Sequence, residues 1–367
     1  MKIVLDNIIF SLQKSGGISV VWFELLKRMV NDPELSLEII ESSIRNENIF
    51  RNELEISQSL ITNDLNLLPI SISRYLSPKI NSKNAIFHSS YYRVNKDPSM
   101  YNVTTVHDFT YEYYRKFTSK YIHSKQKGHA ILNSKKIICV SNNTKKDLLK
   151  FYPEIPDENI KVIYNGVDSV YKKLPKESEG LLKTMIPFES CEYVLYVGDR
   201  KAKYKNFSMT VKSCEISKLP LVMVGGGGLS KHELEFLNSS LGKNNFSILT
   251  GISNVQLNLI YNHAFVLLYP SFYEGFGIPI LEAQNAGCPV ISTNLSSVPE
   301  VAGKGAVLLN SITVESIVDN LNMLKKDTLY YENLVSEGFL NSKKFSWDKC
   351  YQETKLLYSN IYKEEFN

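Results

Sequence analysis

The chain has 367 residues, of which 43% are hydrophobic and 22% charged, and its formal net charge is +4. These values are ordinary for globular proteins and exclude a disordered or fibrous chain. The length is too great for one ordinary core and predicts two domains of about 170–190 residues.

The first half predicts alternating strands and helices. Short apolar runs, each followed by turn residues, predict strands at 2–5, 37–41, 85–88, 103–106, 136–140 and 160–164. Between residues 46 and 84 the periodicity is too poor to place elements.

The second half alternates more regularly. Strands are expected at 192–197, 219–224, 246–249, 264–269, 289–292 and 306–309. These runs are almost continuously apolar, which is typical of strands covered on both faces in a doubly wound parallel sheet. Residues 172–190, rich in Pro, Glu, Ser and Lys, resemble a linker. The expected domains are 1–172 and 173–345 (including this linker), with a C-terminal helix at 346–367 that packs back on the first.

Five widely separated cysteines form no C-x-x-C pair, which argues against a disulfide framework or a zinc site and favours a reducing compartment. No apolar run approaches the ~18 residues needed to span a bilayer. The opening MKIVLD predicts a first strand and not a signal peptide. We therefore expect a cytoplasmic protein.

The segment from Tyr269 to Glu282 is the most informative motif. A buried strand ends at Tyr269, a glycine-rich turn follows, and Pro279 suits the first turn of a helix. The free N–H groups of such a helix start can bind phosphate or sugar hydroxyls. Glu274 and Glu282 flank this turn and are expected to face one crevice, where carboxylates accept hydroxyl hydrogen bonds. The donor-binding candidates here are Gly275, Phe276, Gly277, Ile278 and Glu282.

Glu274-x7-Glu282, within EGFGIPILEA, resembles the signature of retaining glycosyltransferases of family 4. The resemblance extends over most of the chain. It includes Gly16-Gly17, His107-Asp108, the loop 198–206, the glycines 225–228, the tripeptide 250–252 and the motif 345–347. It implies a GT-B fold, in which two Rossmann-like domains face a cleft, with the donor on the second domain and the acceptor mainly on the first.

In this family, the first Glu contacts the transferred sugar and the second the ribose, so the resemblance implies these roles for Glu274 and Glu282. It also implies that Arg200 and Lys205 bind the donor diphosphate, where fixed cations stabilise the developing charge as a metal would. Lys201 and Lys203 are rivals for that role. Since the chain has no D-x-D motif and no metal-ligand spacing, we expect no metal or other cofactor.

Further roles follow from the same resemblance. Gly16 and Gly17 are expected at the donor diphosphate, Gly225 at the nucleoside, and Gly251 with Ile252 at the base. His107 is expected to bind the transferred sugar or the reacting oxygens. No covalent nucleophile is expected, because such enzymes are thought to work by front-face attack.

Acceptor contact is a separate hypothesis that does not come from the motif. An aromatic and basic segment follows the strand at 85–88, and such side chains suit a sugar or a phosphate. A packed aromatic loop accounts for this segment equally well. Its candidate residues are His88, Tyr91, Tyr92 and Arg93.

The donor and acceptor stay open at this stage. GDP-mannose is the first candidate, with UDP-hexoses and dTDP-sugars close behind, and the acceptor is expected to be an oligosaccharide or a polyprenyl-diphosphate-linked glycan in surface-polysaccharide assembly. A sugar-nucleotide 2-epimerase, a non-catalytic nucleotide-sugar sensor and a dehydrogenase are alternatives. Residues 112–136 carry seven Lys or Arg and one Glu, which predicts either a solvated face or contact with an anionic membrane. No nucleic-acid partner is expected.

Overall fold

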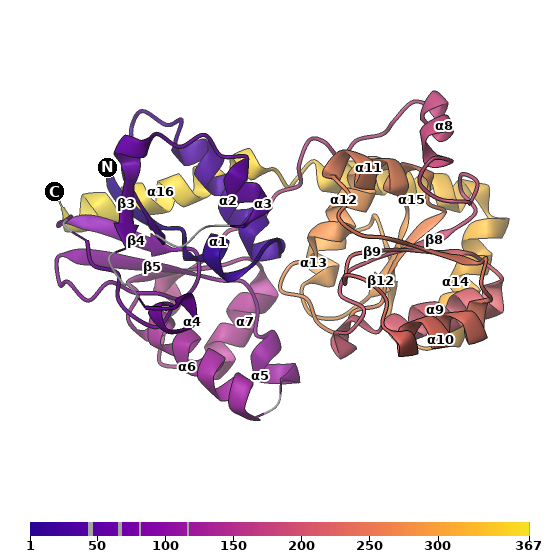
Figure 1. Ribbon diagram of the computed structural model, residues 1–367, viewed down its shortest axis with the longest axis horizontal. Coiled ribbons are helices and arrows are strands. Elements are labelled where there is room, and N and C mark those ends of the chain that lie inside the picture. The colour runs from indigo at the N-terminus through magenta and orange to yellow at the C-terminus, as the bar shows by residue number, and fades with distance from the viewer. Residues whose placement is uncertain (43–46, 65–67, 81, 116, 367) are drawn as a thin grey trace. The chain divides into compact units, whose positions relative to one another are not determined.

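The computed structural model describes residues 1–42, 47–64, 68–80, 82–115 and 117–366. The chain forms two compact units, Met1–Gly166 with Trp347–Asn367, and Val167–Ser346 (Figure 1). Each unit has its own parallel sheet with helices on both faces.

The first unit contains a seven-stranded sheet in the order β3-β2-β1-β4-β5-β6-β7, and all neighbouring strands are parallel. The order reverses between β1 and β4, which makes the carboxyl ends of these strands the topological switch point. The strands are β1 Lys2–Asp6, β2 Ser36–Ser42, β3 Ile61–Asp64, β4 Ala85–Ser89, β5 Met100–Val106, β6 Lys136–Cys139 and β7 Ile160–Val162. The helices are α1 Ile8–Leu12, α2 Gly17–Met29, α3 Ile49–Asn52, α4 Ile70–Ser73, α5 Thr110–Tyr114, α6 Phe117–Leu132, α7 Asn142–Phe151 and α16 Trp347–Glu365, with short 3-10 turns at Gln58–Leu60 and Asp157–Asn159.

The second unit contains a six-stranded parallel sheet in the order β10-β9-β8-β11-β12-β13, which reverses between β8 and β11. Its strands are β8 Val194–Val197, β9 Leu221–Val224, β10 Phe246–Leu249, β11 Val266–Tyr269, β12 Val290–Thr293 and β13 Val307–Leu309. Its helices are α8 Glu179–Leu182, α9 Phe207–Ser217, α10 Lys231–Leu241, α11 Asn254–His263, α12 Ile278–Ala286, α13 Val298–Ala302, α14 Val314–Lys326 and α15 Thr328–Ser342, with 3-10 turns at Lys176–Ser178 and Lys203–Lys205.

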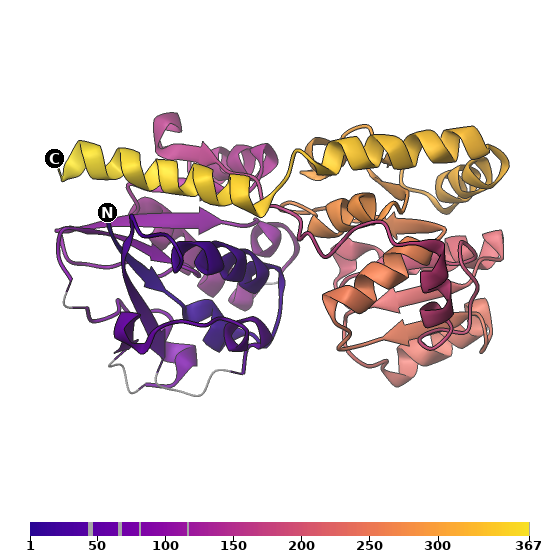
Figure 2. The same ribbon diagram turned by 90° about the horizontal axis from the view of Figure 1, so that it is seen from above.

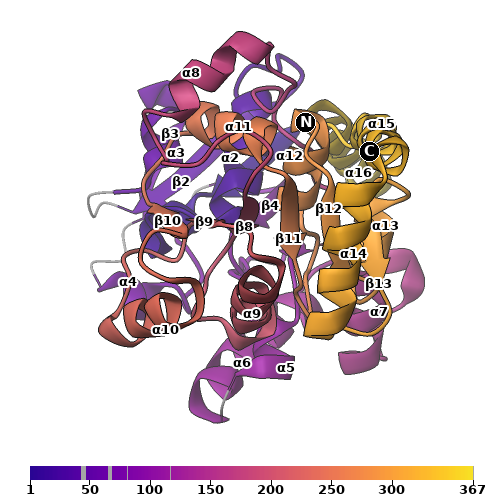
Figure 3. The same cartoon turned by 90° about the vertical axis from the view of Figure 1, so that its right-hand side faces the viewer.

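The second sheet is apolar on both faces. Along β8, Leu195 packs into one core cluster, whereas Val194 and Tyr196 pack into another. Successive strand residues point to opposite faces, so each continuous apolar run supplies two cores at once. Figure 3 shows α9, α10 and α14 on one side of this sheet and α11 and α12 on the other.

The sequence-predicted strands correspond to all thirteen observed strands except β3, which lies in the stretch where no element could be placed. The linker interpretation of 172–190 is wrong for the described structure. Leu182, Ile186 and Phe188 are buried in a core of the second unit, and the backbone N–H of Lys172 donates to Asn258. The change between units therefore falls at Gly166, a few residues before the expected boundary at 172.

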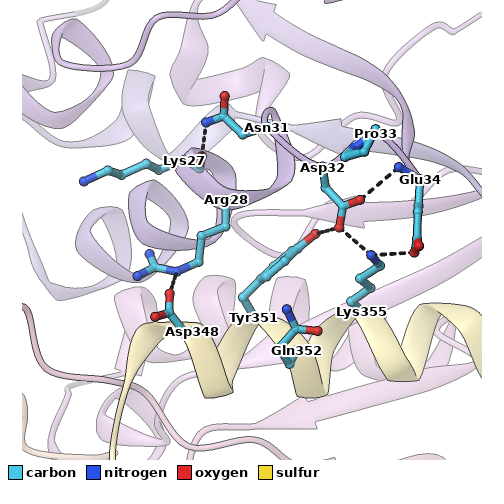
Figure 4. A pocket seen from close by; sticks show the side chains of 10 residues that line it. All are labelled: Lys27, Arg28, Asn31, Asp32, Pro33, Glu34, Asp348, Tyr351, Gln352 and Lys355. Atoms are coloured by element: carbon cyan, nitrogen blue, oxygen red, sulfur yellow. Dashed lines mark hydrogen bonds and ion pairs between the residues drawn. The ribbon is translucent and has the colours of Figure 1, made fainter.

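The C-terminal helix α16 packs along the first unit, beside α2 (Figure 2). Ion pairs join α16 to the end of α2 and to the loop that follows it (Figure 4): Arg28 Nε lies 2.7 Å from Asp348, and Lys355 Nζ lies 2.6 Å from both Asp32 and Glu34. Pairs with a strongly exposed partner, here Arg28–Asp348 and Lys355–Glu34, contribute little. The larger contribution comes from the apolar face of α16, where Trp347, Tyr351, Tyr358 and Ile361 are buried.

One buried hydrogen bond connects α16 with the centre of the first sheet. The hydroxyl of Tyr358 bonds Nδ1 of His88, whose Nε2 lies 2.9 Å from Thr105 Oγ1. Burial lowers the pKa of His88 to about 3, so the ring is neutral.

We predict that Tyr358→Phe destabilises the protein by about 1–3 kcal/mol, because the buried Nδ1 atom of His88 loses its partner. Urea unfolding should show a lower midpoint with an unchanged slope. Tyr362→Phe is the matched control, because Tyr362 lies on the same helix and its hydroxyl bonds no described residue. Equal midpoints for the two variants would contradict the prediction.

Candidate active site

The candidate donor site lies at the switch point of the second sheet, where the strand order reverses between β8 and β11. The loop after β8 carries Arg200 and Lys205, and the loop after β11 carries Glu274. Strands β8 and β11 are parallel neighbours, so both loops leave the same edge of the sheet. In open α/β sheets, ligands bind outside the carboxyl ends of the strands at this point.

Lys205 and Glu274 form a largely buried ion pair. Lys205 Nζ lies 2.7 Å from Glu274 Oε1 and donates to the Tyr269 hydroxyl at 3.0 Å. Burial alone would lower the pKa of Lys205, but the charge of Glu274 raises it well above its usual value. The lysine is therefore a fixed cation. Lys201 and Lys203 are exposed, which leaves Lys205 as the lysine of this loop that reaches Glu274.

Two serines after β12 hold the turn that carries Glu274. The backbone N–H of Glu274 donates to Ser296 Oγ at 2.9 Å. The Ser297 hydroxyl donates to the carbonyl oxygens of Glu274 and Phe276 at 2.8 and 3.0 Å. These bonds fix the turn before α12 begins, so the carboxylate is preorganised.

The turn 275–278 forms the start of α12. Gly277 is the N-cap residue, with a φ of 101° that favours glycine, and no side chain caps the helix. Pro279 lies in the first turn, as the sequence predicts. Phe276 is buried, whereas Gly275 and Ile278 are partly exposed. A helix N-terminus without a side-chain cap can bind an anion or a hydroxyl.

Arg200 differs from the expectation. Its side chain is fully buried and donates to the carbonyl oxygens of Gly225 and Gly227, while its Nε lies 3.3 Å from Glu233 Oε1. Gly226 has a φ of 72°, and a Cβ there would lie 2.9 Å from the guanidinium. In this structure Arg200 supports the glycine turn, so direct contact with a diphosphate would require these bonds to be exchanged.

The next loop, after β10, keeps its expected residues near the same edge of the sheet. Gly251 is exposed with a φ of 66°, a conformation that favours glycine. Ile252 is partly buried against a core cluster. The loop can therefore present backbone groups to a ligand.

Glu282 has partners separate from those of Glu274. Its Oε2 accepts a hydrogen bond of 2.9 Å from the Tyr261 hydroxyl, and Tyr171 also donates to it. Burial raises the pKa of Glu282 to about 7, and the two tyrosines oppose this shift while the charge of Asp168 adds to it. The two carboxylates therefore have different local chemistry.

In the first unit, His107 follows β5 and is partly exposed. Burial of the ring lowers the pKa of His107 to about 4, with opposing effects from Asp108 and Lys127. The imidazole is therefore neutral near pH 7 and can accept or donate one hydrogen bond. Gly16 caps α2 in an extended conformation, and a Cβ on Gly17 would meet no atom within 4 Å. The start of α2 has no side-chain cap, which leaves its N–H groups available.

The acceptor hypothesis is not supported for His88 and Arg93. His88 is fully buried with both ring nitrogens bonded, as described above. Arg93 is buried between Asp64, at 2.7 Å, and Asp6, at 3.4 Å. Both side chains stabilise the interior of the first unit.

The two tyrosines of this segment have different environments. Tyr92 is buried, whereas Tyr91 is partly exposed and its hydroxyl lies 2.8 Å from Nε2 of His123. Arg74 stacks over the Tyr91 ring. Of the four acceptor candidates, Tyr91 keeps a partly exposed polar aromatic surface.

The basic segment 112–136 is also less uniform than its composition suggests. Lys127 is fully buried and pairs with Glu112 at 2.8 Å, and Tyr113 donates to Asp147 at 2.7 Å. Lys120 and Lys125 are exposed, while Lys116 lies outside the described residues. Lys127 is therefore a structural cation and not part of a charged surface.

Comparison with known families accounts for this arrangement. A family model described as "Glycosyl transferases group 1" matches residues 186–339, and the model "Glycosyltransferase Family 4" matches residues 85–170. The first match spans the loops around Lys205, Glu274 and Glu282. This chain is a glycosyltransferase with group 1 and family 4 domains. Together the two matches cover about two thirds of the glycosyltransferase.

Curated relatives are similar at modest identity. O-antigen chain mannosyltransferase B of Escherichia coli is 26% identical over 269 residues, which cover 70% of this glycosyltransferase and 69% of the relative. O-antigen chain mannosyltransferase RfbU of Salmonella typhimurium is 28% identical over 247 residues, or 65% and 66% of the two chains. The serotype-specific mannosyltransferase WbdA of Escherichia coli is 26% identical, but the match covers only 27% of that protein.

Solved structures share the fold. The HepE protein of Anabaena, in complex with UDP and glucose, has a TM-score of 0.73 at 14% identity, and the match covers 98% of this glycosyltransferase and all of that chain. Sucrose-phosphate synthase of Thermosynechococcus elongatus has a TM-score of 0.72 at 14% identity, covering 99% of each chain. The glycosyltransferase therefore has the GT-B fold.

Sequence reasoning missed the residues that position the two carboxylates. Tyr171, Tyr261, Ser296 and Ser297 contact Glu282 or the Glu274 turn, but none of them lies in a recognised motif. The only signal for the serines was their position just after a predicted strand. Among the described residues, no cluster of three or more His, Cys, Asp or Glu could hold a metal ion.

We predict that Tyr261→Phe moves the pH-dependent rise in nucleotide affinity to a higher pH. If Glu282 binds the ribose as a carboxylate, affinity in the wild type rises as the pH increases through about 7. Loss of the tyrosine hydroxyl removes a bond that lowers the pKa, so the variant needs a higher pH for the same ionisation.

Isothermal titration with the nucleotide between about pH 6 and pH 9 measures this shift, and the two proteins should converge at the alkaline end. Tyr193→Phe is the matched control, because Tyr193 is a buried tyrosine whose hydroxyl bonds the carbonyl oxygen of Ile260 at 2.6 Å. An unshifted profile in Tyr261→Phe, or the same shift in the control, would refute the prediction.

Proposed function

We propose that this glycosyltransferase transfers a sugar from a nucleotide-sugar donor to a glycan or lipid-linked acceptor, with retention of the anomeric configuration, in surface-polysaccharide assembly. The observation that carries the proposal is the Lys205–Glu274 pair at the switch point of the second sheet, beside the uncapped start of α12. This arrangement brings a fixed cation, a carboxylate and a helix N-terminus without a side-chain cap to one edge, which suits a charged and hydroxyl-rich donor.

The donor is proposed to be GDP-mannose. The support is that two of the similar curated relatives are named O-antigen chain mannosyltransferases. UDP-sugars are the next candidates, since the HepE structure contains UDP and glucose. The acceptor is proposed to be an oligosaccharide or a polyprenyl-diphosphate-linked glycan.

In the proposed reaction, the acceptor hydroxyl attacks the anomeric carbon on the face from which the nucleoside diphosphate departs. The bond from the anomeric carbon to the phosphate oxygen breaks, a bond to the acceptor oxygen forms, and the departing phosphate takes the acceptor proton. Lys205 stabilises the negative charge that develops on the leaving group. Glu274 and neutral His107 are proposed to bind hydroxyls of the transferred sugar, and Glu282 the ribose.

Arg200 is proposed to act on the diphosphate once donor phosphates replace its bonds to the glycine turn. Gly16, Gly17, Gly225, Gly251 and Ile252 remain proposed donor contacts through their backbones. The proposed location is the inner face of the cytoplasmic membrane. No described helix is long and apolar enough to cross a bilayer.

We predict that replacing Glu282 weakens nucleotide binding, whereas replacing Glu274 mainly lowers the turnover rate. A thermal-shift panel with GDP, UDP and dTDP first identifies the nucleotide, because a ligand at about 100 times its Kd stabilises by about 2.7 kcal/mol. Glu282→Ala should then weaken binding of that nucleotide by about tenfold or more, because a ribose contact is made equally in the ground state and the transition state.

Glu274→Gln should instead lower kcat by about tenfold or more with little change in nucleotide binding, because contacts at the reacting sugar strengthen in the transition state. Glutamine keeps the size of the side chain beside Lys205, so folding is preserved better than with Ala. Unchanged kinetics in both variants would remove the paired-carboxylate assignment. Turnover of the donor to an epimer without acceptor would exclude sugar transfer.

We also predict that activity survives chelation by EDTA. The positive charge of Lys205 can stabilise the leaving group without a divalent ion. Initial rates of sugar transfer should be similar with EDTA and with added Mg²⁺ or Mn²⁺. Complete loss of activity on chelation, restored by either ion, would contradict the proposed role of Lys205 at the leaving group.

A further inference from the structure

A pocket lies within the first unit, between the residues after α4, the residues after β4, and α6. Its volume is about 340 Å³. Figure 1 shows α4 and α6 next to one another on the same side of the first unit. The pocket is lined by Tyr75, Leu76, Ser77, Tyr92, Arg93, Val94, Lys96, Tyr121, Ile122, Lys125, Gln126 and His129.

Large apolar side chains are exposed around this pocket. Tyr121 is 65% exposed, Ile122 51%, Tyr75 48% and Leu76 39%, and Ile72 on α4 is 50% exposed. Single exposed apolar residues are common, but four that line one pocket form a contiguous patch. Covering this patch would remove apolar surface from water and is favourable.

The charged side chains of the pocket are cationic. Lys96 and Lys125 are exposed, and neither lysine makes an ion pair with a described residue. Lys125 instead lies over the ring of Tyr121, with Nζ 5.8 Å from the ring centroid. Arg93 is neutralised by its two aspartates, and the described lining includes no Asp or Glu. The apolar patch therefore has a rim that attracts anions.

We infer that this pocket and its rim bind anionic membrane lipid, with the lipid phosphate at Lys96 and Lys125 and its hydrocarbon against Tyr75, Leu76, Tyr121 and Ile122. Charge complementarity selects this occupant, because an apolar patch with a cationic rim matches an anionic amphiphile. The inference rests on the proposed function for its purpose, since it would hold the first unit beside a lipid-linked acceptor. The binding itself requires neither donor nor sugar transfer.

Vesicle sedimentation tests the inference with the full chain. Wild-type protein should sediment with phosphatidylcholine vesicles that contain about one third phosphatidylglycerol, and not with pure phosphatidylcholine. Binding should fall in about 1 M salt, where the screening length shortens to about 3 Å. Equal binding to both vesicle types, or none to the anionic vesicles at low salt, would overturn the inference.

Matched variants separate the apolar and charged contributions. Tyr121→Ser with Ile122→Ser should reduce vesicle binding at least about fivefold, whereas Leu329→Ser, which changes a 68% exposed residue of the second unit, should not. Lys96→Gln with Lys125→Gln should also reduce binding, whereas Lys212→Gln with Lys231→Gln, two exposed lysines of the second unit, should not. If the control variants lost as much vesicle binding as the pocket variants, the inference of a specific lipid-binding surface would be contradicted.

Two further measurements separate lipid binding from self-association and from nucleotide binding. Light scattering at increasing protein concentration detects self-association, and a dimer abolished by Tyr121→Ser with Ile122→Ser would mean that a second copy covers the patch and not lipid. The thermal shift with nucleotide should be unchanged in every variant, because none of these residues belongs to the donor site. Absence of that shift in the wild type with every nucleotide would overturn the proposed function and leave the vesicle result standing.

Discussion

In a parallel sheet, all strands end at the same edge, and this constraint determines where the functional side chains of the second unit lie. Lys205 is separated from Glu274 by about seventy residues of chain, yet the loops after β8 and β11 bring the two side chains into contact. The loops can then vary while the strands stay buried on both faces. The rigid sheet supplies the position, and the loops supply the chemistry.

The Lys205–Glu274 pair has an energetic consequence for the site. Two charges removed from water are costly unless each satisfies the other, and removing one partner of a buried pair typically costs about 3–5 kcal/mol. Tyr269 adds a hydrogen bond to the lysine, and Ser296 fixes the backbone of the glutamate. The charges are therefore held in place before any ligand arrives, as preorganised electrostatic stabilisation requires.

The strands could be predicted from the sequence because a short, continuous apolar run that ends in turn residues is typical of a strand buried on both faces. The Glu274 turn could be predicted for a similar reason, since Gly277 and Pro279 restrict the backbone locally. Tertiary partners could not be predicted in this way. Arg93 is a candidate anion ligand until Asp6 and Asp64 are seen beside it, and Lys127 is a candidate surface charge until Glu112 is placed. The linker interpretation failed because polar composition concealed the three apolar anchors Leu182, Ile186 and Phe188.

The position of α16 makes the first unit discontinuous in sequence. Its sheet is complete by Val162, but the helix that covers α2 and bonds His88 through Tyr358 comes after the whole second unit. During synthesis, domains generally fold as units from the N-terminus. Here the second unit emerges with all its strands and helices before the first can bury the surface that α16 covers. The first unit is therefore completed after the second, although its sheet comes first in the sequence. A ribosome that stalls before residue 347 leaves the first unit without α16.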